Sequence, residues 1–453
     1  MNENNKTLVR GATTLGVGAV IAKLLGAFYR VPLTNLIGGF GLGLYQTVFP
    51  VYALLLDFSG AGVPSALSKL ISSGNENREQ SALKHLKTSI KLMALFGAIG
   101  SFLMLVFARP ISRLQGNSEA FFAYLYLAPS VFLVSLICCF RGYFQGLINM
   151  KPTAVSQVVE QVIKLVLGLF FAYLMLPDIP KAVAGATFAI TISELVALIG
   201  LYLTYRKQKR RLCLYPPLTK SESRCLSKRI ILTTIPITLV GIMIPLSHVI
   251  DSFLTVNILS EYRQDATTLY GLMSGVVCTV INLPVSVCYG ISTVAIPTVS
   301  GSENETEKRN ASIKTIILTL MVSIPCALLL AVFSPFVIRI LFNGLNGGER
   351  TTAIKLLAIS SPNVVLLSLI QTENAILIGK GKPYFPLLSL SIGILVKTIL
   401  SLTLMKLPEI NVFGSAVALI ACYFFTCLVN LIMIFKFKVK NESKRTFNRQ
   451  YAS

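Results

Sequence analysis

The sequence predicts an all-α polytopic membrane protein, with twelve transmembrane helices in two pseudo-symmetric six-helix lobes around a central cavity. Two observations lead to this fold class. Hydrophobic residues make up 54% of the 453 residues and charged residues only 13%. Apolar runs recur along the chain with about the 20 residues that a helix needs to cross a bilayer. Similar segments also recur at a nearly constant spacing, which is typical of an internal duplication.

The apolar runs, taken in chain order, give the individual spans. The first run, from Gly11, is too long for a signal peptide and has no small-residue cleavage site, so we expect it to be a true span. The twelve spans are predicted near residues 11–33, 42–72, 88–108, 119–145, 153–176, 181–204, 229–256, 267–300, 311–334, 350–379, 383–406 and 411–435.

Six spans fall on each side of a basic segment. We therefore expect a first lobe over residues 1–204, a cytoplasmic linker over 205–228, a second lobe over 229–435 and a cytoplasmic tail over 436–453. Matched residues in the two lobes lie 231–234 positions apart: Pro50 with Pro284, Pro64 with Pro297, Gly146 with Gly379, and Pro152 with Pro383. Duplicated halves of membrane transporters rock against each other around a midplane site, so the repeat predicts alternating access.

Positive charge sets the expected orientation in the membrane. The net charge is +22, and Lys and Arg are concentrated in the linker and the tail. We expect the protein to lie in the cytoplasmic membrane. The positive-inside rule then places both termini in the cytoplasm. A basic loop can also bind nucleic acid, but a topology signal in contact with anionic lipids is the simpler interpretation, and no nucleic-acid partner is predicted.

Cysteine and histidine usage argues against metal chemistry. Most of the nine cysteines lie within apolar runs, no C-x-x-C motif occurs, and the chain has two histidines. Cysteines in such positions behave as small apolar residues. We expect no metal and no cofactor, and we expect the protein to act as a monomer.

Charged residues inside the spans are the candidate functional groups, because they are costly in hydrocarbon and usually face a cavity. Lys23 and Arg30 are about two turns apart on one face of the first span. Arg30 could instead extend to the outer interface. The full set of candidate cavity residues is Lys23, Arg30, Arg141, Gln145, Glu160, Lys164, Asp251 and Lys397.

Two readings remain open for several of these residues. Glu160 and Lys164 are spaced i, i+4 and form either a self-neutralised structural pair or part of a substrate site. Lys397 occupies the matching part of span eleven, with no acidic residue near it in sequence. The carboxylates in the spans could bind a cation or a proton, but with five basic residues available most of them are expected to neutralise a Lys or Arg.

Glycine and proline mark a candidate hinge. Gly60, Gly62 and Pro64 interrupt span two, and Gly290 and Pro297 interrupt span eight. A single such interruption is often an ordinary kink. Interruptions in matching spans of both halves are typical of the binding and hinge region of a transporter.

Three stretches resemble a known family. The segment KLLGAFYRVPL from Lys23, the segment GVPSALSK from Gly62, and RGYFQG from Arg141 with PTAVSQVVEQ from Pro152 resemble the stage V sporulation protein B-like family of polysaccharide and lipid-linked oligosaccharide flippases. GKGKP from Gly379 fits as well, and the resemblance extends from about residue 7 to 435. This family belongs to the multidrug/oligosaccharidyl-lipid/polysaccharide exporter superfamily, whose members have two six-helix lobes around a central cavity.

The resemblance implies a transporter, and not an enzyme, that flips a pyrophosphate-linked oligosaccharide or cell-wall precursor by alternating access. Lys23 and Arg30 stand where related peptidoglycan flippases have arginines. The alternatives are a cation-coupled multidrug exporter, which needs a carboxylate-centred cavity, and a membrane glycosyltransferase, which needs an acidic metal pair. The chain has no ATP-binding motif, so the expected energy source is the membrane potential, an unspecified coupling ion or removal of product.

Overall fold

The structure is a computed structural model that describes residues 3–72, 78–209, 220–300, 304–382 and 384–436. Every regular element in these ranges is a helix, as the predicted fold class requires. In chain order they are α1 (Glu3–Leu56), η1 (Asp57–Ala61), α2 (Val63–Ser72), α3 (Arg78–Leu114), η2 (Ser118–Ala120), α4 (Phe121–Gly146), α5 (Lys151–Leu174), α6 (Ile179–Lys209), α7 (Lys220–Ser260), α8 (Ala266–Tyr270), η3 (Gly271–Val277), α9 (Cys278–Ser300), α10 (Glu305–Val332), α11 (Ser334–Leu341), α12 (Gly347–Ser360), α13 (Asn363–Gly379), α14 (Phe385–Leu404) and α15 (Phe413–Lys436).

The number of membrane spans depends on how the first helical run is divided. Ten described helices are long and apolar enough to cross a membrane, or eleven if the pair α12 and α13, bent by 47°, is one span. The first of these runs, Leu15–Ser72, has 58 residues. At 1.5 Å per residue it would be about 87 Å long, nearly three times the thickness of the hydrocarbon core. It breaks at Gly38, whose φ of 69° is left-handed, so it holds two spans and the total is consistent with twelve.

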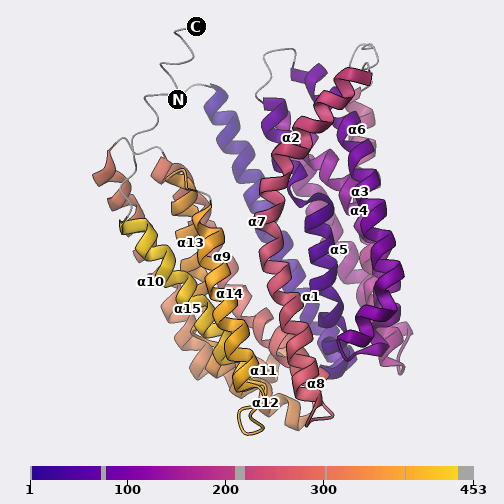
Figure 1. Ribbon diagram of the computed structural model, residues 1–453, viewed down its shortest axis with the longest axis vertical. Coiled ribbons are helices and arrows are strands. Elements are labelled where there is room, and N and C mark those ends of the chain that lie inside the picture. The colour runs from indigo at the N-terminus through magenta and orange to yellow at the C-terminus, as the bar shows by residue number, and fades with distance from the viewer. Residues whose placement is uncertain (1–2, 73–77, 210–219, 301–303, 383, 437–453) are drawn as a thin grey trace.

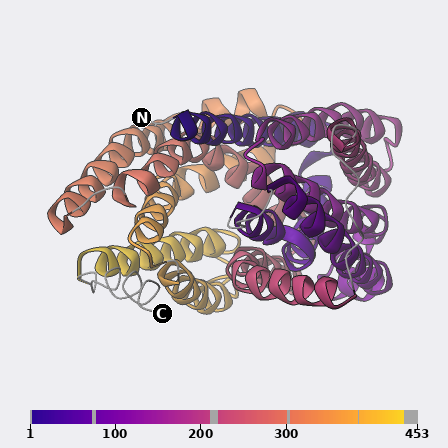
Figure 2. The same cartoon turned by 90° about the horizontal axis from the view of Figure 1, so that it is seen from above.

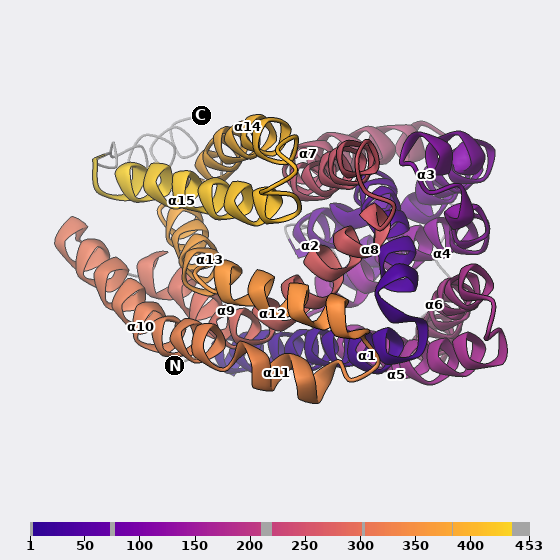
Figure 3. The same ribbon diagram turned by 90° about the horizontal axis from the view of Figure 1, so that it is seen from below.

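The helices form two groups that lie side by side. Helices α2–α6 make up one group and α9–α15 the other, with α1 and α7 packed along the boundary between them (Figures 2 and 3). The start of α1 and the end of α15 lie at the same end of the bundle, which we call the termini face (Figure 1). At the other end, the opposite face, α8, α11 and α12 lie close together, whereas the two groups diverge toward the termini face (Figure 1).

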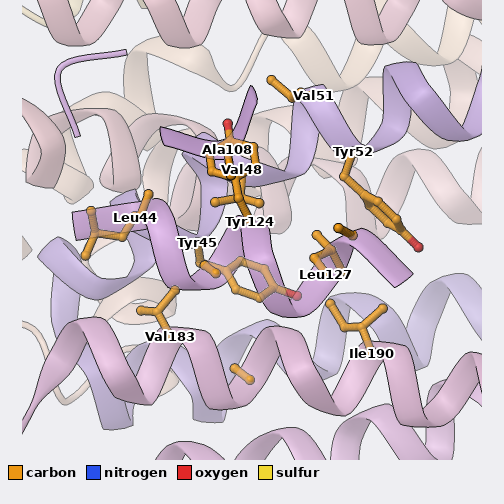
Figure 4. Close-up of a cluster of buried hydrophobic side chains, with 14 of the residues drawn as sticks. Leu44, Tyr45, Val48, Val51, Tyr52, Ala108, Tyr124, Leu127, Val183 and Ile190 are labelled. Carbon is orange, nitrogen blue, oxygen red and sulfur yellow. The ribbon is translucent and has the colours of Figure 1, made fainter. Parts of the chain in front are cut away.

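The core of the first group is built around the second span. Tyr45, Val48 and Tyr52 of α1 are buried against Tyr124 and Leu127 of α4, with α3 and α6 completing the cluster (Figure 4). Residues at i, i+3 and i+7 lie on one helix face, so this stripe of α1 faces the group interior. Large apolar side chains elsewhere, on α3 and α10 above all, are exposed, as expected of surfaces in contact with lipid.

The same kind of turn follows the two helices that the predicted repeat pairs, although residues 115–117 after α3 have this hydrogen-bond pattern too. The N–H groups of residues 147–149 donate to carbonyls four, three and five positions earlier, and those of 380–382 repeat the same pattern. Ile148 and Gly381 at the centre are both left-handed, with φ of 60° and 75°. The two turns are 233 residues apart and follow α4 and α13, which end at Gly146 and Gly379. The geometry supports the predicted pairing of these two glycines, although Pro383 of the next pair lies outside the described residues.

The structure also differs from the predicted elements in three places. Span ten breaks at Pro362, which separates α12 from α13 because a proline has no N–H for the helical ladder. The short helix α11 was not predicted. Helices α6 and α7 extend into the predicted linker, to Lys209 and from Lys220, since charged residues can continue a helix beyond the bilayer; residues 210–219 and 437–453 lie outside the described residues.

Candidate functional site

A cavity of about 330 Å³ lies between α1, α7 and the second group of helices. Its wall draws on α1, α7, α8, η3, α9, α14 and α15, so the chain contributes to it from both halves. The residues around it are Arg30, Gln46, Phe49, Pro50, Ala53, Ile244, Pro245, His248, Asp251, Thr255, Tyr270, Met273, Ser274, Cys278, Asn282, Lys397, Ser401, Ser415, Leu419 and Tyr423. The cavity is the candidate for the central one that the sequence predicts, and that assignment stays a prediction.

Three of the eight predicted cavity residues meet at this cavity: Arg30, Asp251 and Lys397. Arg30 comes from α1, and its Nη1 donates to Thr279 Oγ1 of α9 at 3.2 Å. Lys397 comes from α14, and its Nζ lies 2.6 Å from Asp251 Oδ2 of α7. Two cations and one carboxylate thus line the same space, a net positive balance in a region of low dielectric constant.

Lys23 occupies a different place from Arg30. Its Nζ lies 3.8 Å from the centroid of the Tyr289 ring on α9, a cation–π contact across the boundary between the helix groups. Its side chain is exposed and is absent from the cavity wall. Lys23 is seven residues closer to the termini face than Arg30. Two cations of α1 therefore contact α9, Lys23 nearer that face and Arg30 beside the cavity.

A second charged cluster lies inside the first group. Arg141 Nη2 of α4 is 2.8 Å from Glu160 Oε2 of α5, and Arg141 Nε donates to Ser156 Oγ at 3.1 Å. Lys164 Nζ lies 5.1 Å from the ring centroid of Phe49, which itself lines the cavity. Glu194 of α6 interacts electrostatically with this cluster. Glu160 therefore forms its ion pair with Arg141, and among the described residues none is seen between Glu160 and Lys164, so the role of that i, i+4 spacing stays open.

We expect the Arg141–Glu160 pair to stabilise the first helix group and not to bind substrate. The two side chains are only 14% and 16% exposed, so Arg141→Ala leaves a carboxylate buried without its partner. Such a loss costs about 3 kcal/mol. Thermal unfolding in detergent should show a lower midpoint for Arg141→Ala, with recovery in the double variant Arg141→Gln, Glu160→Gln. An unchanged midpoint in Arg141→Ala would exclude the structural role.

The predicted hinge residues fall on two kinds of local structure. Span two contains a π-helical turn, η1, that includes Gly60, and a Cβ on Gly62 would lie 2.8 Å from Thr238 Oγ1 of α7. Span eight also contains a π-helical stretch, η3, but it covers Gly271–Val277. Helix α9 continues through Gly290, and the side chain of Pro297 lies outside the described residues. The irregular turn of span eight is therefore earlier than the glycine and proline pattern indicated, and the hinge role of these residues stays a prediction.

The opposite face is closed by contacts between the two helix groups. The α1 backbone at Gly39 and Gly43 approaches Gly271 so closely that a Cβ on Gly271 would lie 2.5 Å from Gly39 O. Gln115 Nε2 donates to Ser252 Oγ at 2.9 Å, and Thr267 Oγ1 donates to Asn117 Oδ1. Glycines without side chains and neutral hydrogen bonds make a contact that can separate without placing a buried charge in water or removing water from one.

Sequence reasoning missed the partners of the charged residues. Thr279 and Tyr289 are ordinary residues of an apolar helix, and nothing in their spacing marks them. Ser247 was detectable in principle, since it precedes Asp251 by four positions on the same face of α7, and Lys397 Nζ donates to its hydroxyl. Gln145 lies in the last turn of α4 and is not among the residues around the cavity.

A multi-pass helical bundle with a charged cavity lined from both halves of the chain has the architecture of a membrane transporter. Residues 8–303 match the family described as "Polysaccharide biosynthesis protein", and the chain belongs to this family. It is 28% identical to "Lipid II flippase MurJ" of Bacillus subtilis (strain 168), over 94% of this chain and 82% of that protein. It is 24% identical to "Stage V sporulation protein B" of the same organism, over 92% and 81%.

The fold is also similar to that of solved membrane transporters. The structure matches the inward-facing conformation of a multidrug resistance MATE family transporter of the MOP superfamily with a TM-score of 0.73, covering 95% of this chain and 96% of that one. The identity is 14%, so this match concerns the fold alone. Together the comparisons confirm the predicted family and the predicted fold class.

Proposed function

We propose that this protein flips a pyrophosphate-linked oligosaccharide or cell-wall precursor across the cytoplasmic membrane by alternating access. The observation that carries the proposal is the charge of the central cavity, where Arg30 and Lys397 face a single ionised carboxylate, Asp251. A diphosphate group needs cations that can donate several hydrogen bonds, and Arg and Lys supply them. A cavity for cationic drugs needs the reverse balance. The flippase relative in Bacillus subtilis supports the same substrate class.

The positions of the cations suggest a route. With the termini face in the cytoplasm, the diphosphate first meets Lys23 on α1 and then moves to Arg30 and the cavity. The prenyl chain stays in lipid, because its transfer from hydrocarbon to a polar cavity is unfavourable. The contacts around Gly43 and Gly271 close the opposite face in this state. Their separation would expose the sugar on the other side.

Transport by purified protein in liposomes tests the proposal. A fluorescent prenyl-diphosphate disaccharide is placed in both leaflets, and a membrane-impermeant quencher of its fluorophore reports how fast the inner-leaflet pool reaches the outer one. We expect faster exchange than in protein-free liposomes, and no acceleration for the uncharged prenyl disaccharide. Acceleration of cation uptake, such as ethidium, without diphosphate-lipid exchange would favour the multidrug exporter and overturn the proposal.

A further inference from the structure

The ion pair between Lys397 and Asp251 has an unusual position for a structural pair, because it lies in the wall of the cavity. Lys397 is almost completely buried, with 4% of its side chain exposed, whereas the Asp251 side chain is 23% exposed and faces the cavity. Lys397 Nζ donates to Asp251 Oδ2 and to Ser247 Oγ, which accounts for two of its three N–H donors. The pair joins α14 to α7.

Among the described residues few charged groups surround the pair, and its other titratable neighbours are Tyr270, Cys278, Cys422 and Tyr423. His248, also on α7, has its Nδ1 3.8 Å from Asp251 Oδ2. Arg30 approaches the cavity from α1 and is bonded to Thr279 on α9. On α14 and α15 the other cavity residues are uncharged, namely Ser401, Ser415, Leu419 and Tyr423. Asp251 is therefore the carboxylate that a ligand phosphate would meet when it approaches Lys397.

A carboxylate and a phosphate compete for an ammonium group in the same way. Both are anionic oxygen acceptors, and each forms a short charge-assisted hydrogen bond to N–H. A phosphate beside Lys397 would bring a second negative charge close to Asp251, and like charges that share a site repel each other. The phosphate can then bind Lys397 fully only when Asp251 moves away.

We propose that Asp251 is an internal competitor of the substrate, occupying the phosphate position on Lys397 while the cavity is empty. This inference rests on the proposed function and adds a rule for affinity and selectivity. A diphosphate can contact Arg30 while it displaces Asp251, so the second contact offsets the broken pair. A monophosphate contacts one cation at a time and displaces Asp251 poorly. The return of Asp251 to Lys397 promotes release of the diphosphate after the cavity opens to the other side.

The test measures binding of two defined probes, farnesyl diphosphate and farnesyl monophosphate, to the purified full chain by isothermal titration calorimetry. Asp251→Asn removes the competing charge and keeps the size of the side chain. We expect it to bind the diphosphate about tenfold more tightly, the size of one charge-assisted hydrogen bond, and the monophosphate to gain more, so that selectivity falls. Flipping in liposomes should slow, because release becomes harder.

Three controls separate competition from a structural effect. Asp178→Asn makes the same chemical change outside the cavity wall and should leave both affinities unchanged. Lys397→Gln should weaken diphosphate binding, and adding Asp251→Asn to it should then have no effect, because the competition acts through Lys397. Ser247→Ala keeps the ion pair and should preserve the selectivity between the two probes.

Tighter binding in Asp251→Asn that vanishes in the Lys397→Gln background supports the inference. Affinity equal to or below that of the natural protein, in a variant with an unchanged melting temperature, overturns it and leaves the proposed function intact. If Asp251→Asn does not fold, the affinities of the natural protein for the two probes are compared instead. Binding of the diphosphate at least about tenfold tighter than the monophosphate supports competition, and equal affinity overturns it. No binding of the diphosphate by the natural protein contradicts the proposed function itself.

Discussion

Replacing Arg30 with Ala is expected to abolish flipping of a diphosphate-linked lipid and to weaken its binding by about 10- to 100-fold, which corresponds to the loss of charge-assisted hydrogen bonds to one phosphate. Arg30 comes from α1, opposite Lys397 on α14, and holds a single neutral partner, Thr279, in the unliganded cavity. Within the described residues Arg30 forms no ion pair with a carboxylate, so an anion that binds there breaks none.

The matched variants for this experiment are Arg30→Lys and Lys355→Ala. Lys keeps the charge but loses the planar fork that binds two oxygens at once, so we expect part of the binding and slow flipping. Lys355 is an exposed cation of α12 that is not among the cavity residues, and its removal should change neither measurement. Normal flipping by Arg30→Ala at an expression level and melting temperature like those of the natural protein would remove Arg30 from the site.

The second large effect is expected for Gly43→Leu, which should hold the opposite face open and stop transport. A Cβ on Gly43 would overlap the carbonyl oxygen of Thr267, a backbone atom that cannot move aside by changing rotamer. Overpacking of this kind costs about 1–3 kcal/mol in the closed state alone, enough to shift the ratio of the two facing states by about 5- to 150-fold. Neither helix group needs to unfold for this shift.

Thiol labelling from the opposite face measures the shift. Ser252 is buried at the closed contact, where Gln115 donates to it, so a cysteine at this position should react slowly with a membrane-impermeant maleimide. Adding Gly43→Leu should raise the labelling rate, compared with the same protein without the new cysteine. Gly200→Leu is the control, because nothing lies within 4 Å of a Cβ at Gly200. Equal labelling with and without Gly43→Leu, in an inactive protein, would contradict the closed-gate interpretation.

Much of the architecture follows from local features of the sequence. Apolar runs of about 20 residues dictate spanning helices because backbone groups in lipid must bond within their own segment. Gly38 sits where the first predicted span gives way to the second, since only a residue without Cβ adopts φ of 69° readily. The break at Pro362 could also have been predicted from the sequence. It was not predicted, because the apolar residues continue past Pro362 as one long run.

The candidate site was recoverable only in part. Intramembrane charge identified Arg30, Asp251 and Lys397, which share one cavity, but it equally identified Arg141, Glu160 and Lys164, which form a cluster within the first helix group. Sequence spacing could not separate the two sets. Burying a charge in the membrane is costly, so each charged residue needs either a partner or a cavity. The sequence does not show which of the two a given residue has.

The sequence by itself determined the membrane class and the identity of the charged residues, and it predicts the duplicated halves, because each of these follows from local hydrophobicity, backbone freedom or a fixed repeat. The tertiary structure alone decided which charges meet. Lys397 bonds to Asp251, 146 residues away in the sequence, and Arg30 bonds to Thr279, 249 residues away. Such pairings depend on how helices from the two halves pack, and no local interaction along the chain encodes that packing.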